Sequence, residues 1–283
     1  MIIVDLNQVM ISNFMAQIGN HTNIKIEEDL LRHMVLNSLR GYNAKFRNDY
    51  GEMIIACDDR GSWRRQVFPY YKANRKKDRE QSEIDWNAVF ESLNKIREEL
   101  KTFFPYRVIQ IETAEADDVI GTLCHEYGNT SEKILIISGD KDFRQLHDYM
   151  NVRQYDPVRK KWIEENNPSR YLKEHIMKGD RGDGVPNFLS RDDVFVLSGR
   201  QKPLTTKKLD LWLTLEPEAF CDENMLRGWK RNQQLVDLNY IPADIRKAVI
   251  DSYNAQYGKG REKLFTYFVE NRLKNLLTDI DQF

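Results

Sequence analysis

Residues 133–143 read Lys-Ile-Leu-Ile-Ile-Ser-Gly-Asp-Lys-Asp-Phe, a short apolar run that ends in a glycine and two aspartates. Three similar apolar runs precede it, at 1–4, 53–57 and 107–111, and helical patterns separate all four. This alternation is typical of βαβ units, in which helices cover a largely parallel sheet. We therefore predict an α/β fold with a mostly parallel, twisted sheet flanked by helices.

The sequence between and after these runs is mainly helical. Apolar residues recur at helical spacing over 27–50 and 86–104, and amphipathic stretches at 241–257 and 262–277 dominate the last third. We predict two domains: an α/β domain over residues 1–180, carrying an unusual basic segment at about 60–85, and a smaller α-helical domain over residues 181–283.

Composition limits the class of protein. Of the 283 residues, 41% are hydrophobic and 31% charged, as in a soluble globular protein. The apolar runs are far shorter than the ~18 residues that a membrane span needs. The three cysteines lack C-x-x-C spacing, so neither a disulfide framework nor a zinc site is indicated. We expect a cytoplasmic monomer without a membrane segment.

Carboxylates follow the apolar runs or open the helix after one of them: Asp5, Asp58, Glu115, Asp117, Asp118, Asp140 and Asp142. Any one of them alone is most simply a helix cap or a loop residue. In a parallel sheet, however, all four positions meet at one edge. Charges ~4 Å apart repel by about 4 kcal/mol at an effective dielectric near 20, so this cluster calls for cations. Oxygen ligands suit Mg²⁺, with Mn²⁺ as a substitute, and paired ions are the usual device for phosphodiester hydrolysis.

A basic segment follows Asp58 directly. Residues 60–80 contain eight Lys or Arg against two acids, a local charge of +6, interleaved with four aromatic residues. This mixture suits a nucleic-acid strand, whose phosphates need cations and whose bases stack on aromatic rings. A solvated connector remains the alternative. The residues expected to contact nucleic acid are Arg64, Arg65, Lys72, Arg75, Lys76 and Lys77.

A third unusual stretch is Lys-Gly-Asp-Arg-Gly-Asp-Gly-Val-Pro at 178–186. Its three glycines and two aspartates predict a tight turn that exposes backbone amides and carbonyls to a phosphate or a monovalent ion. Such composition is also common in turns with a purely conformational role.

Several motifs, taken in order, resemble those of the flap endonuclease, or 5′ nuclease, family, and within it the branch of the T-even phage ribonucleases H. They are Ile-Val-Asp-Leu-Asn (3–7), Ala-Cys-Asp-Asp (56–59), Ser-Trp-Arg-Arg (62–65), Tyr-Tyr-Lys-Ala-Asn-Arg (70–75), Glu-Ala-Asp-Asp (115–118), Ile-Ser-Gly-Asp-Lys-Asp-Phe (137–143) and Lys-Gly-Asp-x-x-Asp-Gly-Val (178–185). Their order and spacing agree over almost the whole chain.

The resemblance implies roles for individual residues. One metal ion would be held by Asp5, Asp58, Asp118 and Asp140, helped by Glu115 and Asp117. The second would be held by Asp142, Asp180 and Asp183. The catalytic residues would be Asp118 and Asp140 with Lys72 and Arg75, which would reach the scissile phosphate. Within a helix-hairpin-helix-like element of the second domain, duplex phosphates would contact Gly182, Gly184 and Val185.

The resemblance also implies a function. The protein is expected to be a two-metal 5′-to-3′ exonuclease and flap endonuclease with ribonuclease H activity, removing RNA primers during lagging-strand replication of a phage. Its substrates would be branched or nicked duplex DNA and RNA–DNA hybrid, and its C-terminal domain would contact a single-stranded DNA-binding protein.

Other functions remain open. A single-strand ribonuclease of the PIN type shares the acidic crevice but is usually about half as long and lacks the Gly-Asp-x-x-Asp turn. A non-catalytic branched-DNA-binding protein would keep the shape and lose acids. A phosphatase of the haloacid dehalogenase type needs a second aspartate where Asn7 stands. Isolated histidines are interpreted as structural or surface residues: His21, His33, His125, His147 and His175.

Overall fold

The computed structural model describes residues 1–19 and 27–283, except for the side chains of residues 76–78 and 80. His21 and the side chains of Lys76 and Lys77 therefore lie outside the described residues.

Six strands of the described chain form one sheet, in the order β3-β2-β1-β4-β5-β6. They are β1 (Ile2–Asp5), β2 (Met53–Ala56), β3 (Arg107–Ile109), β4 (Ile134–Ile137), β5 (Val152–Asp156) and β6 (Lys161–Ile163). The first five are parallel, and β6 is antiparallel to β5. The predicted mostly parallel sheet is confirmed. The sequence patterns did not predict β5 or β6, because β5 reads Val-Arg-Gln-Tyr-Asp and lacks an apolar run.

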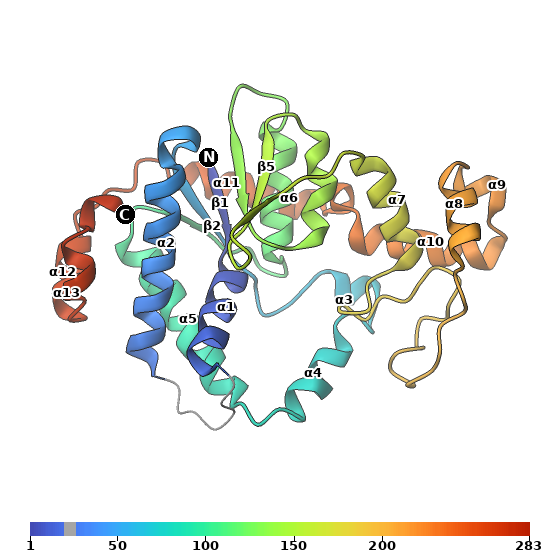
Figure 1. Ribbon diagram of the computed structural model, residues 1–283, viewed down its shortest axis with the longest axis horizontal. Helices are drawn as coiled ribbons and strands as arrows, with labels where there is room; N and C mark the ends of the chain where they lie inside the picture. The colour runs from blue at the N-terminus through green and yellow to red at the C-terminus, as the bar shows by residue number, and fades with distance from the viewer. Residues whose placement is uncertain (20–26) are drawn as a thin grey trace.

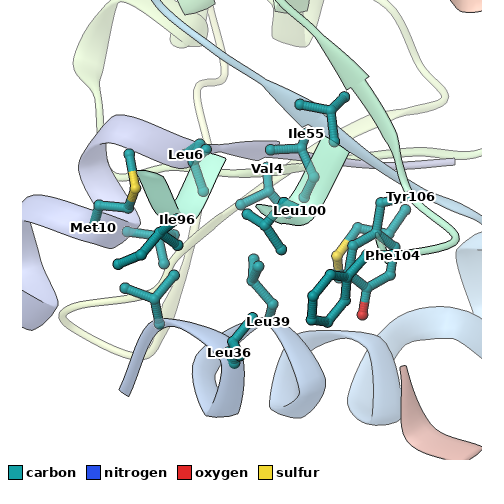
Figure 2. Packing of buried hydrophobic residues seen from close by; sticks show 14 of the residues in the cluster. Val4, Leu6, Met10, Leu36, Leu39, Ile55, Ile96, Leu100, Phe104 and Tyr106 are labelled. Atoms are coloured by element: carbon teal, nitrogen blue, oxygen red, sulfur yellow. The ribbon is translucent and has the colours of Figure 1, made fainter. Parts of the chain in front are cut away.

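Helices cover both faces of the sheet (Figure 1). One face packs against α1 (Leu6–Ile18), α2 (Glu28–Tyr50) and α5 (Trp86–Phe103). Figure 2 shows their side chains meeting Val4 and Ile55 of the sheet. The other face packs against α6 (Ala116–Tyr127) and α11 (Ala243–Ala255). The strands β1, β2 and β4 are buried on both faces, which explains why each is a continuous apolar run rather than an alternating one.

Two short helices form an arch beside the sheet, α3 (Arg64–Val67) and α4 (Ala73–Glu80). The second half of the chain adds η1 (Lys141–Asp148), α7 (Pro168–Lys178), α8 (Thr206–Leu213), α9 (Pro217–Phe220), α10 (Glu223–Val236), η2 (Leu238–Tyr240), α12 (Leu264–Glu270), α13 (Lys274–Leu277) and η3 (Ile280–Gln282). Between α7 and α8, residues 181–205 form turns and irregular chain, although they open the segment predicted to be an α-helical domain.

The C-terminal third contributes to each of the three apolar clusters among the described residues. Tyr267 and Phe283 pack into the cluster beneath α2, and Ile245 packs against α6. The third cluster joins Trp229 to Phe68 of the arch. The division into domains at residue 180 stays a prediction. No helix in the described part of the chain combines the length and the apolarity that crossing a membrane requires.

The strand order places a crevice at the centre of the sheet. From β1 the chain continues to β2 on one side, whereas β4 pairs with β1 on the other side. In open α/β sheets the loops that leave such neighbouring strands diverge, and ligands bind beyond their carboxyl ends. Asp5 ends β1 and Asp140 follows β4, so both lie at this crevice.

Candidate metal and nucleic-acid site

Three carboxylates at the crevice are held by hydrogen bonds from their own and from neighbouring segments. Asp5 caps α1, with Oδ1 accepting from the Gln8 amide (3.1 Å) and Oδ2 from the Ser138 hydroxyl (3.1 Å). Asp58 Oδ1 accepts from the amide of Ala116 (2.7 Å). Asp140 caps η1 by accepting from the amide of Asp142 (2.9 Å). Each acid thus accepts from an amide in the first turn of a helix, where the amides have no partner within the helix and favour a negative charge.

The acids of the crevice interact unfavourably when ionised. Burial and the charge of Asp58 raise the pKa of Asp5 to about 7. Burial and Asp142 raise the pKa of Asp140 to about 6. Burial and Asp140 raise the pKa of Asp117 well above its usual value. A bound divalent cation would offset the repulsion between these carboxylates and favour their ionised forms. Hard cations prefer oxygen ligands, so the residues fit Mg²⁺ or Mn²⁺.

The adjacent acids Asp117 and Asp118 have different environments. Asp117 interacts with Asp140 and Asp5 at the crevice. Asp118 is 0% exposed, and its Oδ2 accepts from the indole N–H of Trp63 (3.1 Å) and from Arg64 Nη1 (3.0 Å). Neighbours on a helix point about 100° apart, so only one of them can face the crevice. Contrary to its expected place among the metal ligands, Asp118 thus points away from the crevice, and Asp117 is the one of the pair that faces the other acids. The metal ligands themselves stay predictions.

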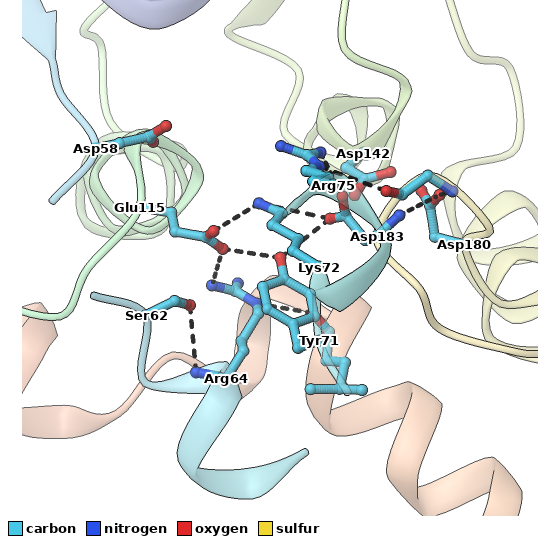
Figure 3. A network of polar contacts seen from close by, with 12 residues as sticks. Asp58, Ser62, Arg64, Tyr71, Lys72, Arg75, Glu115, Asp142, Asp180 and Asp183 are labelled. Carbon is cyan, nitrogen blue, oxygen red and sulfur yellow. Dashed lines mark hydrogen bonds and ion pairs between the residues drawn. The ribbon is translucent and has the colours of Figure 1, made fainter. Parts of the chain in front are cut away.

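Glu115 joins the arch to the crevice (Figure 3). Its Oε1 lies 2.5 Å from Lys72 Nζ, and its Oε2 accepts from the Tyr71 hydroxyl (2.8 Å). Although burial opposes it, Lys72 and Arg64 hold the pKa of Glu115 below its usual value. The same hydroxyl lies 3.0 Å from Asp183 Oδ2, so its single proton is available to either carboxylate. Acids from two distant segments are thus linked through one residue of the arch.

A second group of potential ligands lies beside the first. Ligand atoms of Asp142, His175 and Asp180 lie within 4.8 Å of one another. Asp180 Oδ2 pairs with Lys141 Nζ at 2.8 Å. Burial opposes the shift, but Lys141 holds the pKa of Asp180 below its usual value. Asp140 interacts with members of this group, so the two sets of acids adjoin each other.

The glycine-rich turn supports the arch. The amide of Lys72 donates to the carbonyl of Asp183 (2.7 Å). Gly184 has a φ of +72°, and a Cβ there would lie 3.0 Å from the carbonyl of Tyr70. Glycine therefore suits this position on both counts.

The amides of this turn bond within the turn, which corrects the expectation that they are exposed to phosphate. Asp180 Oδ1 accepts from the amides of Gly182 (2.8 Å) and Asp183 (3.3 Å). The amide of Val185, which is 1% exposed, donates to the carbonyl of Asp180 (2.7 Å). The bound monovalent ion and the duplex contacts at Gly182, Gly184 and Val185 stay predictions.

Arg64 differs from the other basic residues of the arch. It is 3% exposed, and it pairs with Glu115 (3.1 Å) and with Asp118 (2.9 Å). This burial corrects the expectation that Arg64 contacts nucleic acid. The neighbouring Arg65 is exposed and lines a cavity between the arch and the sheet.

That cavity has a volume of about 1170 Å³ and opens beside the crevice. Its lining combines the acids Asp58 and Glu115 with cations of the arch and aromatic rings of α5. The cations are Arg60, Arg65, Lys72, Arg75 and Arg79, and the rings are Trp86 and Phe90. A basic, aromatic-lined cavity next to clustered acids is a suitable path for a single nucleic-acid strand.

We expect the metal-free protein to lose stability as the pH rises from about 4 to about 7. Asp5 and Asp140 have folded-state pKa values of about 7 and 6, above the unfolded value of 3.8, so their protonated forms favour folding. Thermal unfolding in chelator at pH 5 and pH 8 measures this. Asp5→Asn should flatten the slope, whereas Asp148→Asn, at an exposed position, should not. An unchanged slope in Asp5→Asn would contradict the environment described for Asp5.

The fold and the site together define an α/β protein with an acidic crevice beneath a basic arch. Residues 1–177 match the model of the 5′-3′ exonuclease N-terminal, resolvase-like domain, and residues 169–283 match that of the T4 RNase H C-terminal domain. The chain belongs to the 5′-3′ exonuclease and flap endonuclease family.

Individual relatives agree with this membership. The chain is 34% identical to the ribonuclease H of Enterobacteria phage T4, over 99% of this chain and 95% of the relative. Its fold is similar to a bacteriophage T5 flap endonuclease in complex with DNA and metal ions (TM-score 0.58, 19% identity, 90% of this chain and 98% of the other). It is also similar to the T5 5′-exonuclease with bound zinc ions (TM-score 0.57, 19% identity, 90% and 99% of the two chains).

Sequence reasoning missed several residues at this site. Asn7 donates to Asp58, and Ser138 donates to Asp5. Both stand within two residues of a predicted acid, which is the signal that could have pointed to them. His175 offered no such signal, because its contact, Asp142, lies in η1, far from His175 in the sequence.

Proposed function

We propose that this protein is a divalent-metal-dependent, structure-specific 5′ nuclease. It would hydrolyse phosphodiester bonds at 5′ ends and flaps of DNA and of RNA annealed to DNA, and would remove RNA primers during phage replication in the host cytoplasm. The observation that carries the proposal is that acids from four separate loops meet at one sheet edge, directly beside a cationic arch.

The carboxylates would hold two divalent cations. We assign one cation to Asp5, Asp58, Glu115, Asp117 and Asp140, and the other to Asp142, Asp180 and Asp183. When bound, Mg²⁺ or Mn²⁺ ions supply an activated water and stabilise charge on the leaving oxygen. The raised pKa values of Asp5 and Asp140 support this assignment, because such acids keep their charge most easily next to a cation.

Lys72 and Arg75 would contact the scissile phosphate. Lys72 Nζ lies 2.5 Å from Glu115, and Arg75 Nη2 lies 2.5 Å from Asp183. Both cations are thus held at the acidic edge, where the non-bridging oxygens of the substrate would lie. Fixed cations there stabilise charge that develops in the transition state.

The substrate would enter as a single strand through the cavity beneath the arch. Its phosphates would pair with Arg60, Arg65 and Arg79, and its bases would stack on Trp86 and Phe90. Similarity to a T5 flap endonuclease whose structure contains DNA supports DNA as the substrate. Threading of a single strand through the cavity would favour substrates with a free 5′ end.

Cleavage assays test the proposal. A 5′-labelled flap DNA and a 5′-labelled RNA–DNA hybrid would be incubated with Mg²⁺, Mn²⁺ or chelator. We expect cleavage only with a divalent cation and its loss in Asp140→Asn, while Asp148→Asn, at the exposed far end of η1, stays active. Tight binding of the flap without cleavage under any divalent cation would contradict the nuclease proposal and indicate a structure-specific binding protein.

A further inference from the structure

His175 lies among the acids of the second group. It sits near the end of α7, is 6% exposed, and stacks on Tyr171 with ring centroids 6.0 Å apart. Its Nε2 lies 3.0 Å from Asp142 Oδ1. A buried imidazole is thus held by an aromatic neighbour with one ring nitrogen directed at a carboxylate of the crevice.

The contact between His175 and Asp142 is close but lacks hydrogen-bond geometry. Neither Nε2 of His175 nor Oδ1 of Asp142 has a hydrogen-bond partner among the residues that the structure describes. Buried polar atoms rarely stay unpaired, and each such atom calls for an explanation. Two other described histidines contrast with this one, because His125 and His147 each engage both ring nitrogens.

The separation of these two atoms suits a shared metal ion. Neighbouring ligands of an octahedral ion with bonds of about 2.1 Å lie about 3.0 Å apart. Asp180 offers a third donor within 4.8 Å. Its partner Lys141 is 49% exposed, so the lysine can turn to solvent when a cation replaces it.

We propose that His175 is a nitrogen ligand of the second divalent cation, together with Asp142 and Asp180. The inference rests on the proposed function only in requiring divalent cations at this edge. Imidazole binds Mn²⁺, Co²⁺ and Zn²⁺ more readily than Mg²⁺, which prefers oxygen. The second site therefore favours transition metals over Mg²⁺, whereas the first, made of carboxylates alone, does not.

Metal titration and pulsed electron paramagnetic resonance test this inference. Metal-free protein would be titrated calorimetrically with Mn²⁺ and with Mg²⁺, and the Mn²⁺ complex examined for coupling to nitrogen. We expect two Mn²⁺ per chain and a ¹⁴N coupling in the unmodified protein. In His175→Asn the coupling should vanish and one of the two Mn²⁺ ions should lose at least about 10-fold in affinity, with a smaller loss for Mg²⁺. His147→Asn should retain the coupling.

The spectrum of the unmodified protein decides the question even if His175→Asn does not fold. Two bound Mn²⁺ ions with oxygen ligands alone would overturn the inference and leave the nuclease proposal standing. Retention of the nitrogen coupling in a folded His175→Asn would also overturn it. Absence of any stoichiometric Mn²⁺ binding would overturn both proposals.

Discussion

Exchange of Asp117 for asparagine is expected to lower the rate of phosphodiester cleavage by at least about 10³-fold, equivalent to about 4 kcal/mol of transition-state stabilisation. Asp117 faces Asp140 and Asp5 at the crevice, and its neutral amide would bind a cation less well. The fold should remain intact, because this exchange removes a carboxylate that is repelled by its neighbours. Single-turnover cleavage of flap DNA, with binding measured separately, gives the size of the effect.

Asp118→Asn is the matched comparison, one residue further along the same helix. Asp118 is 0% exposed and accepts from Trp63 and Arg64. Loss of its charge leaves a buried guanidinium less well compensated, so we expect a loss of about 3 kcal/mol in the free energy of unfolding. Cleavage below the lowered melting temperature should stay within about tenfold of that of the unmodified protein. Loss of cleavage at unchanged stability in Asp118→Asn, with activity kept in Asp117→Asn, would reverse the two assignments.

The sequence predicts where the site lies better than it predicts which residues form it. Asp5, Asp58 and Asp140 each follow an apolar run, and parallel pairing brings the ends of such runs to one edge. This inference needs only local patterns and one rule of topology. The same reasoning did not identify β5, because this strand contains polar residues and is recognised only by its pairing with β4.

The roles of neighbouring residues depend on tertiary contacts that no local pattern encodes. Glu115, Asp117 and Asp118 stand together in the sequence, and the direction of each side chain is set by the helix phase relative to the crevice. His175 meets Asp142 only because α7 packs on η1. For such residues the sequence supplies candidates, and packing selects among them.

Arg64→Met is expected to lower the free energy of unfolding by about 3–5 kcal/mol, the usual effect of breaking a buried ion pair by removing one partner. Arg64 pairs with Glu115 and Asp118, and its Nε donates to the carbonyl of Leu235 (2.8 Å). Methionine fills part of the space but leaves the buried Asp118 without its cation and Glu115 with Lys72 alone. Urea unfolding measures the loss.

Arg65→Met separates this structural role from contact with the substrate. Arg65 is exposed beside the cavity, so its exchange should change stability by no more than about 0.5 kcal/mol. Flap binding should weaken, and the magnitude of the slope of log affinity against log salt should fall by about 0.7, as expected for the loss of one phosphate contact on a single strand. Fluorescence anisotropy over a range of salt concentrations measures this slope. If Arg64→Met instead kept full stability and lost one phosphate contact, Arg64 would have to leave its buried position when DNA binds, and the arch would rearrange around the substrate.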